Sequence, residues 1–229
     1  MNKFALAVLS VALLTGTASA ADLIIDAPAP EAMAPMSTDS AMYFSIFGGV
    51  NLLDSIDYDS TGGGGTSGEL NFDSGYSIDA ALGVNLGGGL SLEGQLGYLN
   101  ADLTDGTYGG TPFGAEGSAS AVYAMANAWY GIDLGGITPF IGAGVGIANL
   151  TLDSQYDAPF NNASFEDSGV TYAAQVGAGV SLNVTDNMAL TARYRYLMTG
   201  DVDFTDGDGD TVTGHLATNI VDVGLKISF

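Results

Sequence analysis

Six charged residues of this sequence have the types and spacing for ion pairs within one shared interior. The chain holds only four basic residues against 26 acidic ones, and three of the four lie in segments where apolar and polar residues alternate. These three and three acids fall on the polar side of the alternation: Arg193, Arg195, Lys226, Asp79, Glu93 and Asp222. Charges that are removed from water must be paired. We therefore predict that these side chains form a network of ion pairs.

A second group of acids is similar to the start of a calcium-binding loop. Asp206, Asp208 and Asp210 occupy alternate positions, as the first ligands of such a loop do. The loop needs a bidentate acid at its twelfth position, where this chain has Ala217. This mismatch favours a solvated acidic loop over a metal site, with weak divalent binding as the alternative.

The remaining reactive residue types give little support for catalysis. The chain has no cysteine, which excludes disulfides, zinc–thiolate sites and a thiol nucleophile. His215 is the sole histidine, and no motif places a serine or an acid beside it. An imidazole needs such neighbours to serve as the base in hydrolysis. We expect no enzyme activity and no cofactor.

Composition narrows the class of protein further. The formal net charge is −22, and a chain this acidic should repel nucleic acid, which proteins contact through Lys and Arg. Hydrophobic residues make up 47% of the chain, too many for a disordered protein. The 34 glycines argue against long helices, because glycine is a poor helix former. At 229 residues the chain is one domain, or one domain plus tails.

The N-terminus has the features of a secretory signal peptide over residues 1–20. Lys3 supplies the positive region, residues 4–14 form the apolar core, and Ala18, Ser19 and Ala20 form a small-residue cleavage site. The alternative is an uncleaved membrane anchor, but the apolar run is too short to cross a bilayer as a helix. Residues 21–41 are rich in Ala and Pro, which predicts a flexible lead-in.

From residue 42 onward, alternating segments are separated by breaks rich in Gly and Asp. About eight segments have this period-two pattern: 42–53, 75–86, 90–103, 118–133, 138–152, 170–183, 188–203 and about 215–229. Short breaks at 87–89, 134–137 and 185–187 alternate with long acidic breaks at 54–74, 104–117, 153–169 and 204–214. This pattern predicts an all-β fold, an antiparallel up-and-down transmembrane β-barrel of about eight strands.

One segment invites a different interpretation. Residues 134–152 are uncharged, and Gly142 and Gly146 have the spacing of a motif that pairs transmembrane helices. Pro139 and the glycines at every second position argue against a helix there. A strand with Ile141 on its outward face is preferred.

Several stretches resemble the OmpA-like family of outer-membrane β-barrels, and within it the small opacity-type, porin-like barrels of Gram-negative bacteria. They are LSLEGQLGYLNADL at 90–103, MANAWYGID at 125–133, TPFIGAGVGIA at 138–148, AAQVGAGVSLNVTDNMAL at 173–190, RYRYL at 193–197 and the closing Phe229. The resemblance covers residues 42–229. It implies an outer-membrane location, with short turns in the periplasm, long loops outside, and residues 21–41 in the periplasm.

The resemblance also suggests how the lumen is filled. An eight-stranded barrel has an interior just wide enough for side chains. We expect Glu93 near Lys226 and Arg193, and Arg195 near Asp79 and Asp222. Gln95, Asn127 and Trp129 would fill the space around the charges. Five lumenal glycines would leave room for the arginines: Gly142, Gly144, Gly146, Gly177 and Gly179.

The expected partners follow from the same resemblance. They are outer-membrane lipid, lipopolysaccharide, and the barrel-assembly machinery, which would read the C-terminal strand ending in Phe229. Outward aromatics near strand ends would form interfacial girdles: Phe44, Tyr76, Tyr98, Tyr130, Tyr172 and Phe229. Family members that anchor the envelope often carry a peptidoglycan-binding domain after the barrel. The sequence stops at Phe229, so we do not expect that function here.

These observations predict a monomeric, non-enzymatic barrel that contributes to envelope integrity and displays acidic loops outside. A narrow passive channel is the first alternative, and an adhesin whose specificity lies in the loops is the second. A secreted β-sandwich is the main soluble alternative to the fold. Loop composition names neither a solute nor a receptor.

Overall fold

A computed structural model describes residues 42–60, 66–108, 110–156, 164–205 and 211–229. Predicted features at 1–41 and at Asp206, Asp208 and Asp210 lie outside these residues. Within the described residues, no helix is long and apolar enough to cross a membrane.

The described residues form twelve strands. They are β1 (Met42–Leu53), β2 (Ile56–Ser60), β3 (Thr66–Phe72), β4 (Ser74–Gly87), β5 (Leu90–Tyr108), β6 (Thr111–Gly131), β7 (Ile137–Tyr156), β8 (Ser164–Thr185), β9 (Met188–Thr199), β10 (Val202–Thr205), β11 (Thr211–Gly214) and β12 (Ala217–Ser228). The segment 134–152, for which a helix was the alternative, lies mostly in β7.

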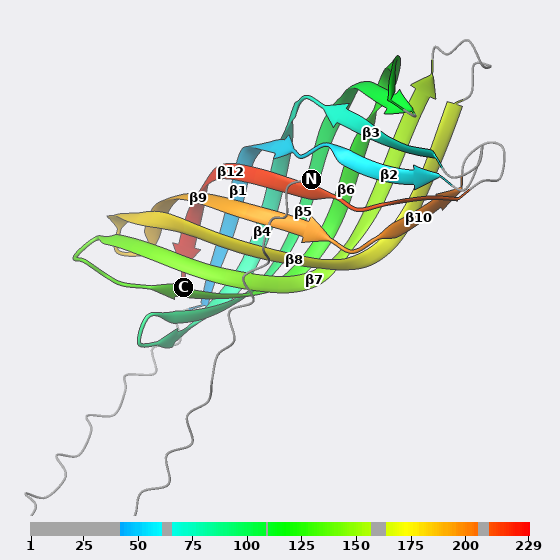
Figure 1. The fold of residues 1–229 in the computed structure, drawn as a ribbon. Helices are drawn as coiled ribbons and strands as arrows, with labels where there is room; N and C mark the ends of the chain where they lie inside the picture. The colour runs from blue at the N-terminus through cyan, green and yellow to red at the C-terminus, as the bar shows by residue number, and fades with distance from the viewer. Residues whose placement is uncertain (1–41, 61–65, 109, 157–163, 206–210) are drawn as a thin grey trace, which may run out of the picture. The chain divides into compact units, whose positions relative to one another are not determined.

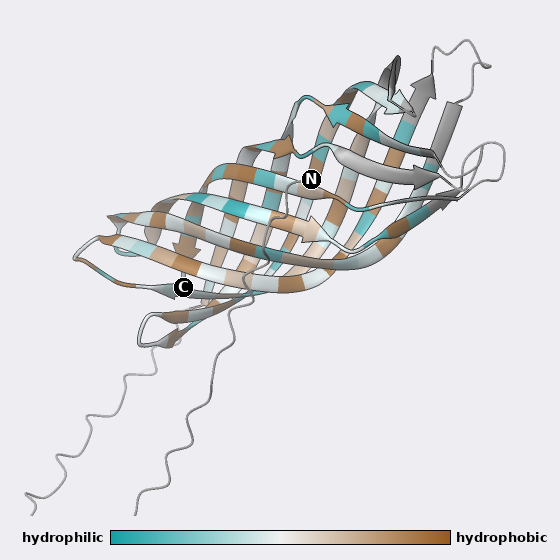
Figure 2. Ribbon diagram, viewed as in Figure 1, coloured by the Kyte–Doolittle hydropathy of each residue, from teal (hydrophilic) through white to brown (hydrophobic). Residues whose placement is uncertain are grey.

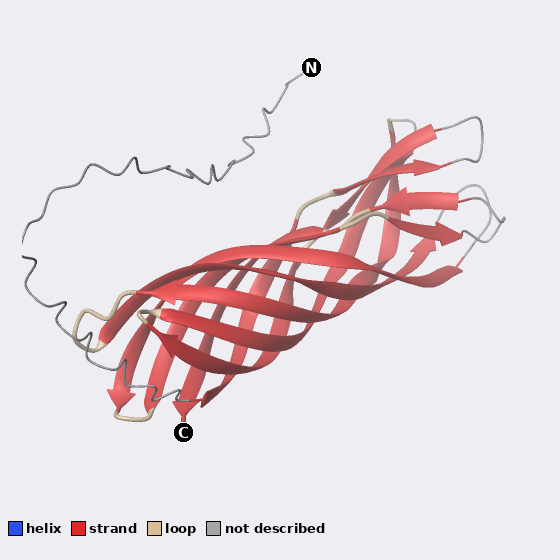
Figure 3. Cartoon of the chain, turned by 90° about the horizontal axis from the view of Figure 1, so that it is seen from below, coloured by secondary structure: helices blue, strands red, loops and turns tan. Residues whose placement is uncertain are grey.

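Eight of these strands close into a ring (Figure 1). Going around it, the order is β1, β4, β5, β6, β7, β8, β9 and β12, each pair antiparallel, and β12 returns to β1. The first and last strands pair over most of their length, from Tyr43 opposite Ser228 to Leu53 opposite Thr218. The prediction of an up-and-down barrel of about eight strands is confirmed, and Figure 3 shows the strands wrapping around it.

The short connections lie at the same end of the barrel as Met42 and Phe229. The amide of Phe229 donates to the Met42 carbonyl at 2.8 Å, which holds the two ends of the described chain together. The turn after β4 is made of three glycines with φ between 62° and 87°, a region that favours glycine. In the turn after β6, the Asp133 carboxylate accepts from the amide of Gly135 at 2.9 Å.

At the opposite end, the prediction of long loops is wrong in part. β5 and β6 continue through 104–117 and pair up to Tyr108 opposite Thr111. The 54–74 connection contains β2 and β3, and the 204–214 connection includes the β10–β11 hairpin, with β11 pairing to β2. Backbone pairing thus continues past the predicted strand ends. We call the outer tier the part of the barrel toward this end, from Leu99 on β5 outward, including these extensions.

The predicted seventh strand, 188–203, is interrupted. β9 ends at Thr199, and β10 starts at Val202. The Gly200 amide donates to the Tyr172 carbonyl at 3.0 Å, and a Cβ at Gly200 would collide with the Tyr172 ring. The chain is therefore held against β8 at this glycine, and Val202 at the start of β10 still packs against Gly169 of β8.

Apolar side chains cover the outside of the ring in a band. Figure 2 shows hydrophobic residues alternating with polar ones along the strands. On β4, exposed outward residues run from Tyr76 to Leu86. At about 3.3 Å per residue and a tilt of about 40°, this run rises by about 25 Å, the height of a lipid-facing band.

The alternation inverts where the strands enter the outer tier. On β5, the outward side carries Leu92 and Leu96 and then Asp102, whereas the inward side carries Glu93 and then Leu99. The outer tier therefore has a polar exterior and an apolar interior, as a water-soluble barrel would. Its buried cluster joins residues from most of the ring strands: Leu53, Leu99, Ala101, Ala119, Ala121, Tyr123, Met125, Ala148, Leu150, Ala173, Leu197, Val202, Leu216 and Ile220.

Candidate functional site: a charge network in the barrel lumen

The six predicted network residues come from four strands of the ring. Asp79 lies on β4, Glu93 on β5, Arg193 and Arg195 on β9, and Asp222 and Lys226 on β12. Residues two apart on a strand share a face, so each strand directs these side chains into the lumen. Asp222 is directly opposite Arg193 in the β9–β12 ladder.

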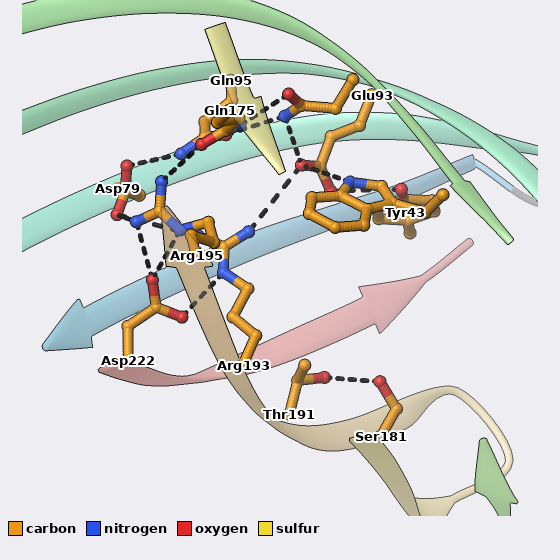
Figure 4. A network of polar contacts seen from close by, with 12 residues as sticks. Tyr43, Asp79, Glu93, Gln95, Gln175, Ser181, Thr191, Arg193, Arg195 and Asp222 are labelled. Atoms are coloured by element: carbon orange, nitrogen blue, oxygen red, sulfur yellow. Dashed lines mark hydrogen bonds and ion pairs between the residues drawn. The ribbon is translucent and has the colours of Figure 1, made fainter. Parts of the chain in front are cut away.

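Arg195 is the centre of the network (Figure 4). Its side chain is 0% exposed. Its Nη2 atom lies 2.7 Å from Asp79 Oδ2 and 2.7 Å from Asp222 Oδ2. Its Nε donates to Asp222 at 3.0 Å, and its Nη1 donates to Gln175 Oε1 at 3.0 Å. One guanidinium thus joins β9 to β4, β8 and β12 across the lumen.

Arg193 lies beside Arg195 and shares its carboxylate. Its Nε donates to Asp222 Oδ1 at 2.7 Å, so Asp222 bridges the two arginines. Asp79 and Glu93 lie farther away, at 3.7 and 3.9 Å from its terminal nitrogens. The guanidinium carbon lies 3.5 Å from the centroid of the Phe47 ring, a cation–π contact. Asp222 therefore contacts both arginines, and not Arg195 alone.

Lys226 has a different environment from the two arginines. Its Nζ lies 3.8 Å from the centroid of the Tyr43 ring. Glu93, which we expected beside Lys226, accepts hydrogen bonds from Tyr43 Oη at 3.2 Å, Asn127 Nδ2 at 3.1 Å and Trp129 Nε1 at 3.2 Å. Tyr43 therefore connects the lysine to the glutamate.

Amide and phenol side chains from β5, β6 and β8 complete the network around Asp79 on β4. Gln95 Nε2 and Tyr123 Oη each donate to Asp79 Oδ1 at 2.6 Å. Gln175 Nε2 donates to Asn127 Oδ1 at 2.6 Å and to Gln95 Oε1 at 2.9 Å. Buried polar groups need such partners, and here they link β4, β5, β6 and β8.

The charges of the network balance. Three acids and three bases share the lumen, and these bases are all the Lys and Arg residues of the chain apart from Lys3. A neutral set avoids the large cost of an uncompensated charge in a medium of low dielectric constant. The acidic excess of the described residues therefore lies outside the network.

Two of the five lumenal glycines leave room for the arginines, as expected. A Cβ at Gly177 would lie 3.1 Å from Cγ of Arg195, and one at Gly179 would lie 2.8 Å from Cβ of Arg193. The other three glycines make room for neighbours on β6: Gly142 for Trp129, Gly144 for Asn127 and Gly146 for Met125. Gly97 does the same for Asp79 and Tyr123.

The sequence also matches a known family. Residues 8–229 match the protein-family profile described as outer membrane protein beta-barrel domain. The chain belongs to this family. The protein is therefore a barrel of the bacterial outer membrane, and its apolar band faces lipid. No curated protein resembles the sequence at a significant level.

Several solved structures have a similar fold. Neisserial surface protein A is 19% identical with a TM-score of 0.50, covering 81% of this chain and 97% of its own. OprG from Pseudomonas aeruginosa is 14% identical with a TM-score of 0.50, covering 82% and 97%. The outer membrane protease OmpT from Escherichia coli is 10% identical with a TM-score of 0.51, covering 84% and 98%. At these identities the likeness concerns the fold alone.

A cavity of about 620 Å³ lies at the end of the barrel that holds the short turns. In this family that end faces the periplasm. Arg193, Glu93 and Trp129 line it together with Lys226 and Tyr43. Thr191 and Ser181 are among its lining residues and share a hydrogen bond of 2.8 Å.

His215 lies apart from the network. Its Nδ1 is 3.6 Å from Asp201 Oδ1, and both side chains are more than half exposed. The structure thus places an acid beside the histidine, which no sequence motif indicated. Among the described residues, no group of three or more His, Cys, Asp or Glu could hold a metal ion.

Some members of the network were missed in the sequence. Tyr43 and Phe47 face the lumen from β1, Tyr123 from β6 and Gln175 from β8. Each has the inward parity of its strand, so the alternation alone indicated their side of the sheet. Their partners depend on strand register, because two inward residues meet only when the ladders place them at the same height.

Proposed function

We propose that this outer-membrane barrel has a structural role in the envelope and a lumen that does not conduct. The observation that carries the proposal is the filling of the lumen by two successive layers. The charge network spans it around Arg195, and the apolar cluster of the outer tier follows, with Leu99, Leu197 and Ile220 fully buried.

The two layers differ in how they oppose ion passage. Hydrated ions would have to separate Arg195 from Asp79 and Asp222, contacts of 2.7 Å each. They would then meet buried leucine and isoleucine side chains, where charge is poorly solvated. A narrow passive channel, the first alternative, would need both layers to rearrange together.

Solute efflux from vesicles tests this proposal. Purified barrel is inserted into phosphatidylcholine vesicles loaded with a small sugar and with potassium, and the release of each is followed. We expect release at the rate of protein-free vesicles. Release that rises in proportion to the amount of barrel inserted would refute a closed lumen.

We propose further that the protein has no catalytic activity. His215 and Asp201 are exposed at the outer tier and form a contact of 3.6 Å, longer than the hydrogen bond that orients a catalytic base. Hydrolysis of peptide or ester substrates that disappears in His215→Ala would overturn this.

The proposed partners are lipid, lipopolysaccharide and the barrel-assembly machinery, and the proposed state is a monomer. Residues 1–20 would direct export and be removed, and residues 21–41 would remain in the periplasm. Phe229 is 69% exposed at the end of β12, a position accessible to an assembly factor. N-terminal sequencing of the envelope protein tests the cleavage, and a start at Met1 would contradict it.

Loop-mediated adhesion remains the second candidate, and one observation favours it. β2, β3, β10 and β11 extend the sheet beyond the ring, so the outer connections are built on paired strands. A sheet of this kind can present side chains in fixed positions. Binding of cells that carry a variant lacking residues 56–72 to abiotic and host surfaces would test it, with the wild-type barrel as the control.

A further inference from the structure

The periplasmic cavity has two cationic groups with different contacts. Lys226 lies along its wall with Nζ over the Tyr43 ring, at 3.8 Å from the centroid. An ammonium placed on an aromatic face keeps hydrogen-bond donors free for other partners. The side chain of Lys226 is half-buried, whereas Arg193 is 4% exposed.

Arg193 lines the same cavity and has an unused donor. Among the described residues, its Nη2 atom has no hydrogen-bond partner although it is buried. Its nearest carboxylate oxygen there, on Asp79, is 3.7 Å away, and the full hydrogen bond to Asp222 uses Nε. Arg193 thus makes one full hydrogen bond to a carboxylate, and its other acids lie at 3.7 and 3.9 Å, so its positive charge at the cavity wall can still attract an oxyanion.

Three acids also line the cavity, and two of them are engaged by neutral donors. Glu93 accepts from Tyr43, Asn127 and Trp129. Asp133 accepts from the amides of Gly135 at 2.9 Å and Gly136 at 3.3 Å. Asp186 lies in the exposed turn between β8 and β9, at the mouth of the cavity. Neutral donors thus share the charge of Glu93 and Asp133, although Glu93 also lies 3.9 Å from Arg193 Nη1, and this weakens the competition of these carboxylates with an incoming anion for the two bases.

We propose that this cavity binds a small oxyanion, a phosphate or a carboxylate, which enters from the periplasm and is held by Lys226 and Arg193. Hydroxyl and amide side chains of the wall, among them Ser45, Ser91 and Asn183, supply further donors. A volume of about 620 Å³ is within the range of small-ligand sites. This site does not depend on whether the lumen conducts.

Trp129 provides a direct readout. It is the sole tryptophan of the chain, and it lines the cavity. The folded barrel in detergent micelles is titrated with sodium phosphate, and separately with sodium succinate, at constant ionic strength held with sodium chloride. We expect a saturable change in Trp129 emission with at least one of the two oxyanions, and none when chloride alone is varied.

Three variants assign the response. Lys226→Gln should weaken oxyanion binding about tenfold or more, the value of one charge-assisted hydrogen bond. Lys226→Arg should retain it. Asn149→Asp is the matched control, because it changes the net charge by the same amount on the exposed outside of β7 and should leave binding unchanged.

The results that would overturn the site are equally defined. They are a change that is linear in concentration or equal in chloride, a Lys226→Gln variant that binds like the wild type, or an Asn149→Asp variant that binds as weakly as Lys226→Gln. Loss of binding in Lys226→Arg would also overturn it. If Lys226→Gln does not fold, Asp186→Asn decides: removal of this rim charge should tighten binding, and weaker or unchanged binding refutes the site.

Discussion

Replacement of Arg195 by alanine should destabilise the barrel strongly. The change removes four contacts of 2.7 to 3.0 Å and leaves Asp79 and Asp222 buried, with only Arg193 to neutralise them. Breaking a buried ion pair by removal of one partner costs about 3–5 kcal/mol. Two carboxylates lose a partner here, so we expect a loss at the upper end of that range.

Urea unfolding in lipid vesicles, followed by Trp129 fluorescence, measures this loss. With an m-value of about 2 kcal/mol per M, a loss of about 5 kcal/mol lowers the midpoint by about 2.5 M. The double variant Arg195→Met, Asp79→Asn restores charge balance at similar volume, and it should recover at least half of the loss. Removal of charge and partner together is far less costly than removal of one alone.

The opposite outcome is informative. A midpoint within about 0.5 M of the wild type for Arg195→Ala would mean that water in the lumen solvates the two carboxylates, by the same m-value. A double variant as unstable as Arg195→Ala would mean that packing volume, and not charge pairing, accounts for the effect. Either result would refute the reasoning that places a dry ion-pair network at the centre of the barrel.

Three further predictions test the layers of the barrel. Gly97→Ala adds a Cβ that collides with lumenal side chains, so it should lower the free energy of unfolding in urea by about 1–3 kcal/mol. Gly94→Ala, on the lipid face of the same strand, should lower it by less than about 0.5 kcal/mol. Equal losses would contradict the assigned faces. Val145→Arg, at a side chain 67% exposed on the lipid face, should cost about 2–4 kcal/mol, and Asn149→Arg, two steps of alternation farther toward the outer end of β7, about 0–1 kcal/mol. A cost at Asn149 matching that at Val145 would move the membrane boundary outward. Deletion of Phe229 should lower the amount of folded barrel in cells and leave refolding into detergent unchanged. Folded barrel is measured as the heat-modifiable form, the protein whose gel mobility differs between unboiled and boiled samples. A normal amount of this form in cells would exclude an assembly role for Phe229.

The ring could be predicted from the sequence because each of its strands alternates over a long run. Short turns with glycines at 87–89 and 134–137 fixed where the strands reverse. The inward positions of the charged residues followed from parity, since a period of two leaves no other face for Arg193 and Arg195 once Tyr194 is outward.

The outer tier could not be predicted, and the reason is physical. Alternation continues along β5 past Tyr98, but the apolar residues change sides there, from Leu96 outside to Leu99 inside. A period-two pattern gives two faces and does not say which one meets lipid, water or a packed interior. Segments such as 104–117, rich in Gly, Thr and Asp, were interpreted as loops although their backbones pair as strands.

The contacts of the network depend on the position of each residue along the barrel axis as well as on the face of the strand. Lys226 and Glu93 share the interior, yet Lys226 lies over Tyr43 while Glu93 accepts from three neutral donors. Asp222 serves both arginines because the β9–β12 register places it opposite Arg193 and next to the long side chain of Arg195. Registers across eight strands set these heights, and no local sequence pattern encodes them.

Single-channel recording in a planar phosphatidylcholine bilayer tests the closed lumen most directly. The wild-type barrel, inserted at a density confirmed by its heat-modifiable gel mobility, should give no steady current at moderate voltage. The Arg195→Ala variant, in which the charged layer is opened and the apolar layer of Leu99, Leu197 and Ile220 remains, should also be silent or show only brief events. Long-lived open events of uniform size in the wild type would contradict the account and identify the barrel as a pore.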